Sequence, residues 1–337
     1  MKNKIEIIAE IGVNHDGYFN KAIKMIDIAK KNGANTVKFQ NFSAKHLVKI
    51  NAKKTRYQLK TTSKKQSHYD MLKKLELSKD EFLKIANYCR KKKIEFLSTP
   101  YDLESVEFLE KLKVHRYKIA STDIVDLLLH KKIISTKKPV IISTGASNIN
   151  EIRKTVNFYK SKKHNKITLL HCVSNYPCSY ESINLNVLNT LKSEFKYPIG
   201  YSDHSSSNLA AIMSVCFGVS IIEKHFTLNK NSIGPDHEAS INPQELKEYI
   251  NSIRLAEKIL GTSKKEIKKE EINIRKISRK SITLKHDLFK NNKISEKDII
   301  MKRPGTSLIG HELFNVLGRK IKKNLKKDHQ LSKRDLV

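Results

Sequence analysis

The sequence predicts an α/β protein whose main part is a (β/α)8 barrel, followed by a small β-rich domain. Roughly the first 260 residues repeat one unit, a short β-branched run followed by an amphipathic helical pattern. The unit occurs eight times, which is the rhythm of such a barrel. No GxGxxG turn follows any run, which disfavours a doubly wound open sheet. A chain of 337 residues also exceeds one ordinary core unless the fold is a large barrel.

Short runs of mainly apolar, often β-branched residues mark the eight expected strands. These runs are residues 5–11, 34–39, 94–97, 116–120, 139–142, 167–170, 199–201 and 219–222. Stretches with apolar residues at helical spacing separate them. The expected helices are residues 21–31, 79–92, 102–112, 150–160, 206–217 and 243–260. Strands that alternate with helices in this way favour a parallel sheet.

Three segments depart from the repeat. Residues 48–67 are a lysine-rich insertion after the second strand, which a barrel would place over its C-terminal mouth. Residues 263–280 are charged and poor in apolar side chains, so we expect a linker or an exposed helix. We therefore expect a barrel domain over residues 1–262 and a second domain over residues 281–337. A domain of that size with few aromatic residues is not expected to be held by a core of its own.

The composition limits the class of protein. The net charge of +32 suggests a nucleic-acid-binding protein as an alternative. The lysines are spread over the chain, however, and no zinc finger, basic zipper or RNA-binding aromatic motif accompanies them, so nucleic acid is not the expected partner. The four cysteines form no CxxC pair, and no run approaches the roughly 20 apolar residues of a membrane span. We expect a cytoplasmic protein without a membrane partner.

Polar side chains stand at or just past the ends of all eight expected strands. In such barrels the C-terminal strand ends meet at one mouth, where the chemistry takes place. Charged groups within otherwise buried runs are costly unless they are paired or functional. The strand-end residues are Glu10, Lys38, Gln40, Thr99, Lys118, Ser121, Ser143, His171, Ser174, Ser202, His204, Glu223 and His225. Together they predict a site at the mouth.

The kinds of residue at these positions indicate the chemistry. The cations and short donors that suit a phosphate and a carboxylate are Lys38, Thr99, Lys118, Ser121, Ser143, Ser174 and Ser202. His204 and His225 end adjacent strands and can place two imidazoles on one divalent cation. Glu10 is then a free carboxylate placed for proton transfer. The mouth therefore suits a small phosphorylated acid and a carbonyl polarised by a metal.

Motifs along almost the whole chain resemble those of one family. The segments are AEIGVNHDG (9–17), VKFQ (37–40), STP (98–100), YKIAS (117–121), STG (143–145), LLHCVSNYP (169–177), GYSDHS (200–205), IEKHFT (222–227), GPDHEAS (234–240) and KRPG (302–305). In this order they resemble the sialic acid synthases, which include the N-acetylneuraminate and legionaminic acid synthases. The resemblance implies a C-terminal antifreeze-like (SAF) domain and a domain-swapped homodimer in which KRPG reaches the other subunit's barrel mouth.

The resemblance also implies roles for the site residues. Lys38 and Thr99 would face the carboxylate of phosphoenolpyruvate, and His204 and His225 would hold Mn²⁺ or Mg²⁺. The groups implied to face the phosphate are Lys118, Ser121, Ser143, Ser174 and Ser202. The groups implied to hold the open-chain sugar are Gln40, Tyr176, Asp236 and Arg303. Three departures from the family pattern, Ser174, Asp123 and Ala146, affect substrate detail and remove no reacting group.

The implied reaction condenses phosphoenolpyruvate with an N-acyl hexosamine, by metal-assisted aldol-type addition and C–O cleavage, with Glu10 managing the protons of water. The main interpretation is an N-acetylneuraminate synthase that uses N-acetylmannosamine. The alternative is a legionaminic acid synthase that uses 2,4-diacetamido-2,4,6-trideoxymannose. A pseudaminic acid synthase fits less well, because the resemblance associates that branch of the family with a different residue after GPD from the one in this sequence.

Overall fold

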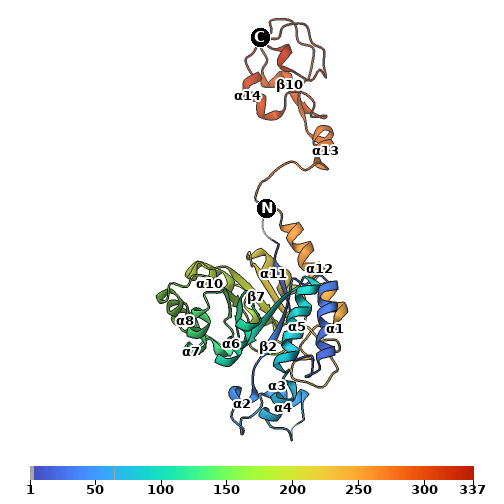
Figure 1. Ribbon diagram of the computed structural model, residues 1–337. Coiled ribbons are helices and arrows are strands. Elements are labelled where there is room, and N and C mark those ends of the chain that lie inside the picture. Colours follow the sequence, from blue (N-terminus) through green and yellow to red (C-terminus); the bar gives the residue numbers. More distant parts are fainter. Residues whose placement is uncertain (1–3, 64) are drawn as a thin grey trace. The chain divides into compact units, whose positions relative to one another are not determined.

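The computed structural model describes residues 4–63 and 65–337. The chain forms two compact units, Met1–Gly261 and Thr262–Val337 (Figure 1). Within the described residues, no helix is both long and apolar enough to cross a membrane.

The first unit is built around eight parallel strands. They are β1 (Glu6–Gly12), β2 (Thr36–Asn41), β3 (Glu95–Pro100), β4 (Tyr117–Ile119), β5 (Val140–Ser143), β6 (Ile167–His171), β7 (Ile199–Asp203) and β8 (Ile221–His225). Their order is β3-β2-β1-β8-β7-β6-β5-β4, so the first strand pairs with the last. β3 and β4 lie against each other and close the ring. The predicted (β/α)8 barrel is confirmed.

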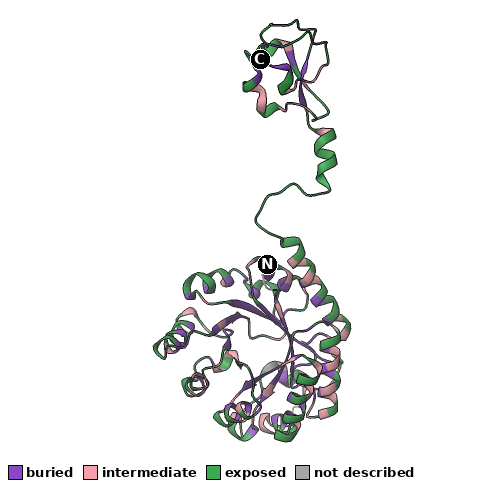
Figure 2. Ribbon diagram, turned by 45° about the horizontal axis from the view of Figure 1, so that its top comes forward, coloured by how far each residue is buried: buried purple, intermediate pink, exposed green. Residues whose placement is uncertain are grey.

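The strands are buried on both faces, as Figure 2 shows for the centre of this unit. The outward face packs on the helices through residues such as Ile7 and Ala9. The inward face fills the barrel with a layer of five side chains, Ile8, Leu97, Ile141, Leu170 and Ile221. Because side chains alternate along a strand, the residue two positions after each of these also points into the barrel.

Helices surround the barrel, and two of them were not expected from the sequence. The main helices are α1 (Phe19–Lys31), α5 (Lys79–Lys92), α6 (Leu103–Lys111), α7 (Leu127–Ser135), α8 (Ile149–Ser161), α10 (Val187–Phe195), α11 (Leu209–Cys216) and α12 (Pro243–Leu260). α7 and α10, of nine residues each, lie outside the helical stretches named from the sequence. Several strands also end one to three residues later than expected, so the polar strand-end residues are part of the ladder.

The predicted insertion, residues 48–67, contains the helix α3 (Arg56–Thr61) and is flanked by α2 (Ala44–Leu47) and α4 (His68–Leu75). These three helices lie together at one end of the unit (Figure 1), and with the segments between them they are called the insertion region below. Met71, Leu72 and Leu75 of α4 pack with Val13 and Ala44 in a small separate core. The shorter elements of the remaining mouth are η1 (Ser121–Asp123) and α9 (Tyr180–Ile183).

The second unit has a core of its own, contrary to expectation. Its elements are α13 (Glu271–Ser278), β9 (Ser281–Leu284), η2 (Glu296–Asp298), β10 (Ile299–Lys302), η3 (Gly310–Glu312), α14 (Leu313–Val316) and η4 (Lys333–Asp335). β9 and β10 form an antiparallel pair. Eleven buried apolar side chains, Ile282 and Leu331 among them, make up the core. Aliphatic residues from many short segments therefore replace the aromatic residues that the sequence lacks here.

Candidate active site

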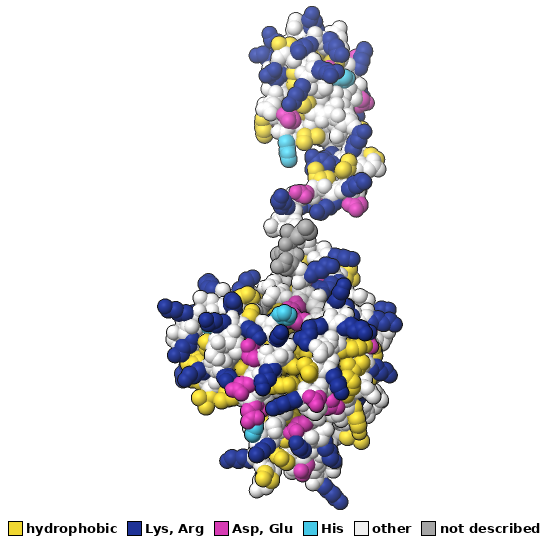
Figure 3. Space-filling view, in the orientation of Figure 1, with side chains coloured by type: hydrophobic (Ala, Val, Ile, Leu, Met, Phe, Trp, Pro, Cys, Tyr) yellow, Lys and Arg dark blue, Asp and Glu magenta, His cyan; other side chains and the backbone are white. Residues whose placement is uncertain are grey.

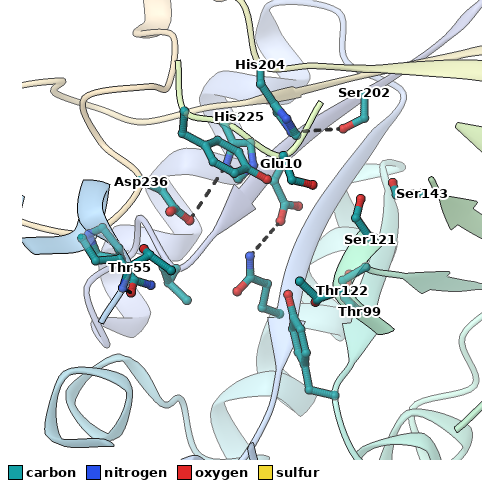
Figure 4. A pocket seen from close by; sticks show the side chains of 18 of the residues that line it. Glu10, Thr55, Thr99, Ser121, Thr122, Ser143, Ser202, His204, His225 and Asp236 are labelled. Atoms are coloured by element: carbon teal, nitrogen blue, oxygen red, sulfur yellow. Dashed lines mark hydrogen bonds and ion pairs between the residues drawn. The ribbon is translucent and has the colours of Figure 1, made fainter. Parts of the chain in front are cut away.

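A cavity of about 360 Å³ opens at the C-terminal ends of the barrel strands (Figure 4). Thirteen of the fourteen predicted site residues line it: Glu10, Lys38, Gln40, Thr99, Lys118, Ser121, Ser143, Ser174, Tyr176, Ser202, His204, His225 and Asp236. Arg303 belongs to the second unit, where it is exposed just after β10. Its role at the cavity stays a prediction.

Strand alternation explains why these groups converge. Glu10, Thr99, Ser143 and Glu223 each follow an inward-facing core residue by two positions, so all four point into the barrel one layer above that core. The apolar layer fills the barrel beneath the cavity, and the polar layer above it forms the floor of the cavity.

Two buried lysines and two buried glutamates form the floor of the site. Lys38 Nζ lies 3.3 Å from Glu10 Oε2 and 3.3 Å from Glu223 Oε2. Lys118 Nζ lies 3.5 Å from Glu223 Oε1 and donates a 2.7 Å hydrogen bond to Ser143 Oγ. Glu223 therefore bridges both lysines. The sequence marked Glu223 as a strand-end residue but assigned it no role, because its contact with Lys118 crosses the barrel between strands far apart in the chain.

The two carboxylates of this cluster titrate differently. Burial raises the pKa of Glu10 to about 7, although Lys38 opposes the shift. Burial acts in the same direction on Glu223, but Lys118 and Lys38 outweigh it and lower the pKa of that carboxyl below its usual value. Near neutral pH, Glu223 is thus a permanent anion, while Glu10 can hold or release a proton.

Short donors surround a small space beside Lys118. Ser121 Oγ lies 3.1 Å from Cys172 Sγ and accepts a 3.1 Å hydrogen bond from the Gly145 amide. A Cβ at Gly145 would meet Cys172 Sγ and Ser121 Oγ at 2.9 Å, and Ser174 Oγ at a shorter distance still. Glycine therefore keeps this space open. Hydroxyls and an ammonium group around such a space suit a phosphate.

His204 and His225 both face the cavity, and their ring centroids are 5.6 Å apart (Figure 4). His204 Nδ1 donates to the Val173 carbonyl at 2.7 Å, which leaves Nε2 with its lone pair. Among the described residues, His225 Nδ1 has no hydrogen-bond partner. Burial lowers the pKa of His204 to about 4 and the pKa of His225 well below its usual value. Neutral imidazoles with an unprotonated ring nitrogen are the form that binds metals, and in His204 that nitrogen, Nε2, lies 3.4 Å from Ser202 Oγ.

The spacing of the two rings fits a shared cation. Imidazoles that hold one metal at about 2.1 Å have ring centres about 5 Å apart. In residues 4–63 and 65–337, no group of three or more His, Cys, Asp or Glu side chains is arranged to hold a metal. A cation at this place would therefore have two protein ligands and would complete its shell with water or substrate oxygens, as Mg²⁺ and Mn²⁺ accept.

Three further polar side chains, Gln40, Tyr176 and Asp236, line the cavity next to Glu10 and the two histidines. Gln40 Nε2 donates a 3.3 Å hydrogen bond to Glu10 Oε1, and Asp236 Oδ2 lies 3.9 Å from His225 Nδ1. The Tyr176 ring centroid is 4.2 Å from that of His204. Burial raises the pKa of Asp236 to about 6. These groups offer donors and acceptors suited to the hydroxyls and amides of a sugar.

The insertion region forms one wall of the cavity, in line with the prediction that this segment lies over the mouth, but its lining residues were not predicted. Its lining residues are Leu47, Val48, Thr55, Gln58, His68, Met71 and Leu72. Helical spacing could have indicated α4, but no local pattern shows which of its side chains face the cavity. The wall is partly apolar, unlike the polar floor.

Three other histidines have structural roles. His171 Nε2 donates to the Ile183 carbonyl at 2.7 Å, and His15 Nδ1 accepts from the Gly17 amide at 3.0 Å. His237 is fully buried, between Asp16 Oδ1 at 2.8 Å and Thr227 Oγ1 at 2.7 Å. It ties the loop after β1 to the loop after β8.

Lysine and arginine side chains are scattered over both units in the view of Figure 3. They do not gather on one part of the visible face, as a nucleic-acid-binding surface would require. The face shown therefore has no single basic patch of the kind that the nucleic-acid alternative predicts.

The chain is similar to known proteins along most of its length. The model of the NeuB family matches residues 25–265. Over 323 residues, the chain is 41% identical to the N,N'-diacetyllegionaminic acid synthase of Legionella pneumophila, covering 95% of this chain and 91% of that protein. Over 328 residues, it is 43% identical to the Campylobacter jejuni protein of the same name, covering 96% and 98%. A crystal structure of N-acetylneuraminic acid synthetase from Leptospira borgpetersenii, in complex with citrate, has a TM-score of 0.71 at 36% identity, covering 81% of this chain and 90% of that one.

Proposed function

The chain belongs to the NeuB family, the sialic acid synthases, and from this premise we propose that it condenses phosphoenolpyruvate with an N-acyl amino sugar to a nine-carbon 2-keto acid and phosphate. The observation that carries the proposal is the cavity floor. Lys38 and Lys118 are buried there beside the hydroxyls of Ser121, Ser143 and Ser174, in a cavity that also holds two neutral histidines. Such a set suits a small molecule with both a carboxylate and a phosphate.

The residues divide the reaction between them. Lys38 and Thr99 bind the carboxylate of phosphoenolpyruvate. Lys118 binds its phosphate together with the hydroxyls of Ser121, Ser143, Ser174 and Ser202. Glu223 holds both lysines in position before the substrate arrives. C3 of phosphoenolpyruvate then forms a bond to the aldehyde carbon of the open-chain sugar. Water adds at C2, the bond between C2 and the phosphate oxygen breaks, and phosphate leaves.

Glu10 accepts a proton from that water. It lies at the cavity floor beside Lys38, and its raised pKa lets it accept a proton near neutral pH. His204 and His225 would hold Mn²⁺ or Mg²⁺, which when bound supplies a Lewis acid for the sugar's aldehyde oxygen. Gln40, Tyr176 and Asp236 orient the sugar chain across the same cavity.

We propose 2,4-diacetamido-2,4,6-trideoxymannose as the sugar. Two relatives at 41% and 43% identity are named as diacetyllegionaminic acid synthases, whereas the N-acetylneuraminic acid synthetase structure is 36% identical. The apolar part of the insertion wall, Val48, Met71 and Leu72, suits the methyl group of a 6-deoxy sugar better than a hydroxyl. The legionaminic alternative is therefore better supported than the N-acetylmannosamine interpretation drawn from the sequence.

We further propose that the second unit is an SAF domain that acts in a domain-swapped homodimer. Arg303 is exposed directly after β10, next to Pro304 and Gly305. Its planar guanidinium is suited to the acyl carbonyl of a sugar bound in another subunit.

Phosphate release tests the proposed reaction. The purified protein is given phosphoenolpyruvate, Mn²⁺ and either 2,4-diacetamido-2,4,6-trideoxymannose or N-acetylmannosamine. We expect release that depends on the sugar, with kcat/KM at least about tenfold higher for the diacetamido sugar. A preference for N-acetylmannosamine would overturn the choice of sugar. The absence of sugar-dependent release with either compound would overturn the reaction.

A further inference from the structure

A buried ion pair lies directly behind the two histidines. On β7 and β8, Ser202, His204, Glu223 and His225 line the cavity. Alternation turns the intervening residues, Asp203 and Lys224, to the opposite face of the sheet, and the two are paired in the ladder. Both are 1% exposed, and Lys224 Nζ lies 3.1 Å from Asp203 Oδ2.

Asp203 accepts hydrogen bonds from several parts of the chain. Its Oδ1 accepts from the Ser205 amide at 2.9 Å, from Ser205 Oγ at 2.7 Å and from the Tyr201 hydroxyl at 3.2 Å. Its Oδ2 accepts from the Tyr249 hydroxyl of α12 at 2.8 Å. Lys224 also donates to the Ser205 carbonyl, and its Nζ lies 5.5 Å from the centroid of the Tyr249 ring. The carboxylate thus ties β7, β8, α12 and the loop after β7 together.

A buried network of charges contributes little to the free energy of folding. Burying two charges loses hydration free energy that their attraction often fails to regain, and apolar replacements of similar size are often as stable. A fully satisfied buried network does, however, restrict a site to one arrangement. Its position makes that restriction useful, because Asp203 directly precedes His204 and Lys224 directly precedes His225.

We infer that the Asp203–Lys224–Tyr249 network is a positioning device that holds His204 and His225 at the spacing needed for one divalent cation. The inference rests on the metal-assisted function proposed above. The two rings are held differently: His204 contacts the Val173 carbonyl at 2.7 Å and Ser202 Oγ at 3.4 Å, whereas His225 Nδ1 has no hydrogen bond to a described residue. The position of His225 relative to His204 therefore depends on the backbone of the two strand ends, which the network holds together.

Binding of Mn²⁺ alone, followed by the paramagnetic resonance signal of the free ion, tests this inference without any turnover. The variants are Tyr249→Phe, which removes one hydroxyl, and Asp203→Asn, which removes the charge. We expect both to weaken Mn²⁺ binding, Asp203→Asn by about 10- to 100-fold, as for groups that orient metal ligands. Tyr159→Phe is the matched control, because it removes a buried hydroxyl that lies 2.8 Å from His130 Nδ1. It should bind Mn²⁺ like the wild type.

His204→Ala separates the two ways in which the idea could fail. If this variant binds Mn²⁺ like the wild type, the ion is not held here and the proposed metal site is wrong. If His204→Ala loses the ion while Tyr249→Phe and Asp203→Asn keep wild-type affinity, the positioning role is wrong. Thermal unfolding of each variant reports whether it is folded. Tyr249→Phe, which keeps the ring, decides the question should Asp203→Asn fail to fold.

Discussion

At the scale of single residues, the cavity places two carboxylates with opposite protonation preferences around one lysine. Glu10 and Glu223 each lie 3.3 Å from Lys38, yet the pKa of Glu10 is raised to about 7 and that of Glu223 is lowered. The difference arises because Lys118 lies close to Glu223. Pairs of titratable groups whose pKa values are pushed apart commonly divide acid–base work between them. Glu223 is suited to fix the lysines, and Glu10 to move a proton.

The Glu10→Gln variant tests this division. Glutamine keeps the size and hydrogen bonding of the side chain but cannot take up a proton. We expect kcat to fall by roughly a hundredfold or more, while phosphoenolpyruvate binds nearly as well as to the wild type. Calorimetric titration with phosphoenolpyruvate measures binding and also shows that the variant is folded. Normal turnover would mean that another group handles the proton.

At the scale of secondary-structure elements, the sequence predicted the strands and the floor of the site well, for a physical reason. A barrel strand is apolar on both faces except at its C-terminal end, so Lys38, Lys118 and Glu223 stood out within otherwise apolar runs. The place of the insertion over the mouth was expected from its position after the second strand, but the side chains that form the wall could not be predicted. The packing of α4 over the mouth depends on contacts between segments far apart in the chain, such as Met71 with Val13, which no local pattern records.

Substitutions of Leu72 test whether the wall formed by the insertion region helps to select the sugar. Leu72→Asn places an amide in the apolar part of the cavity, so the KM for the 6-deoxy diacetamido sugar should rise by about tenfold, with the KM for phosphoenolpyruvate unchanged. Leu72→Met keeps the wall apolar at similar volume and should behave like the wild type. Steady-state kinetics with each substrate varied in turn measures both constants. Equal changes for both substrates would show that the wall has no part in choosing the sugar.

At the scale of the whole molecule, the chain consists of two units with separate cores. Thirteen predicted site residues lie in the first unit, and Arg303 lies in the second. The sequence underestimated the second unit, because its core comes from isolated aliphatic residues such as Leu288, Ile321 and Leu331. Those residues show no helical or strand period from which a core could be recognised.

Mixed dimers test whether Arg303 acts in another subunit. Arg303→Ala and Glu10→Gln subunits, each poorly active alone, are mixed under conditions that allow exchange. If Arg303 acts in the partner barrel, one barrel of each mixed dimer has both groups, and about one quarter of all sites should recover activity after random exchange. Phosphate release measures the recovery, and native mass spectrometry shows whether mixed dimers form. Mixed dimers that form but stay inactive would place Arg303 in its own subunit's site or in none.

The fate of the oxygen that joins C2 to phosphorus tests the central claim most directly. Phosphoenolpyruvate carrying ¹⁸O at this bridging position is incubated with the protein, Mn²⁺ and the diacetamido sugar, and the phosphate is examined by ³¹P NMR. We predict that the label leaves with the phosphate and that the new keto oxygen comes from water. Retention of the label in the organic product, or release of phosphate at the same rate without sugar, would contradict a condensation with C–O cleavage in this cavity.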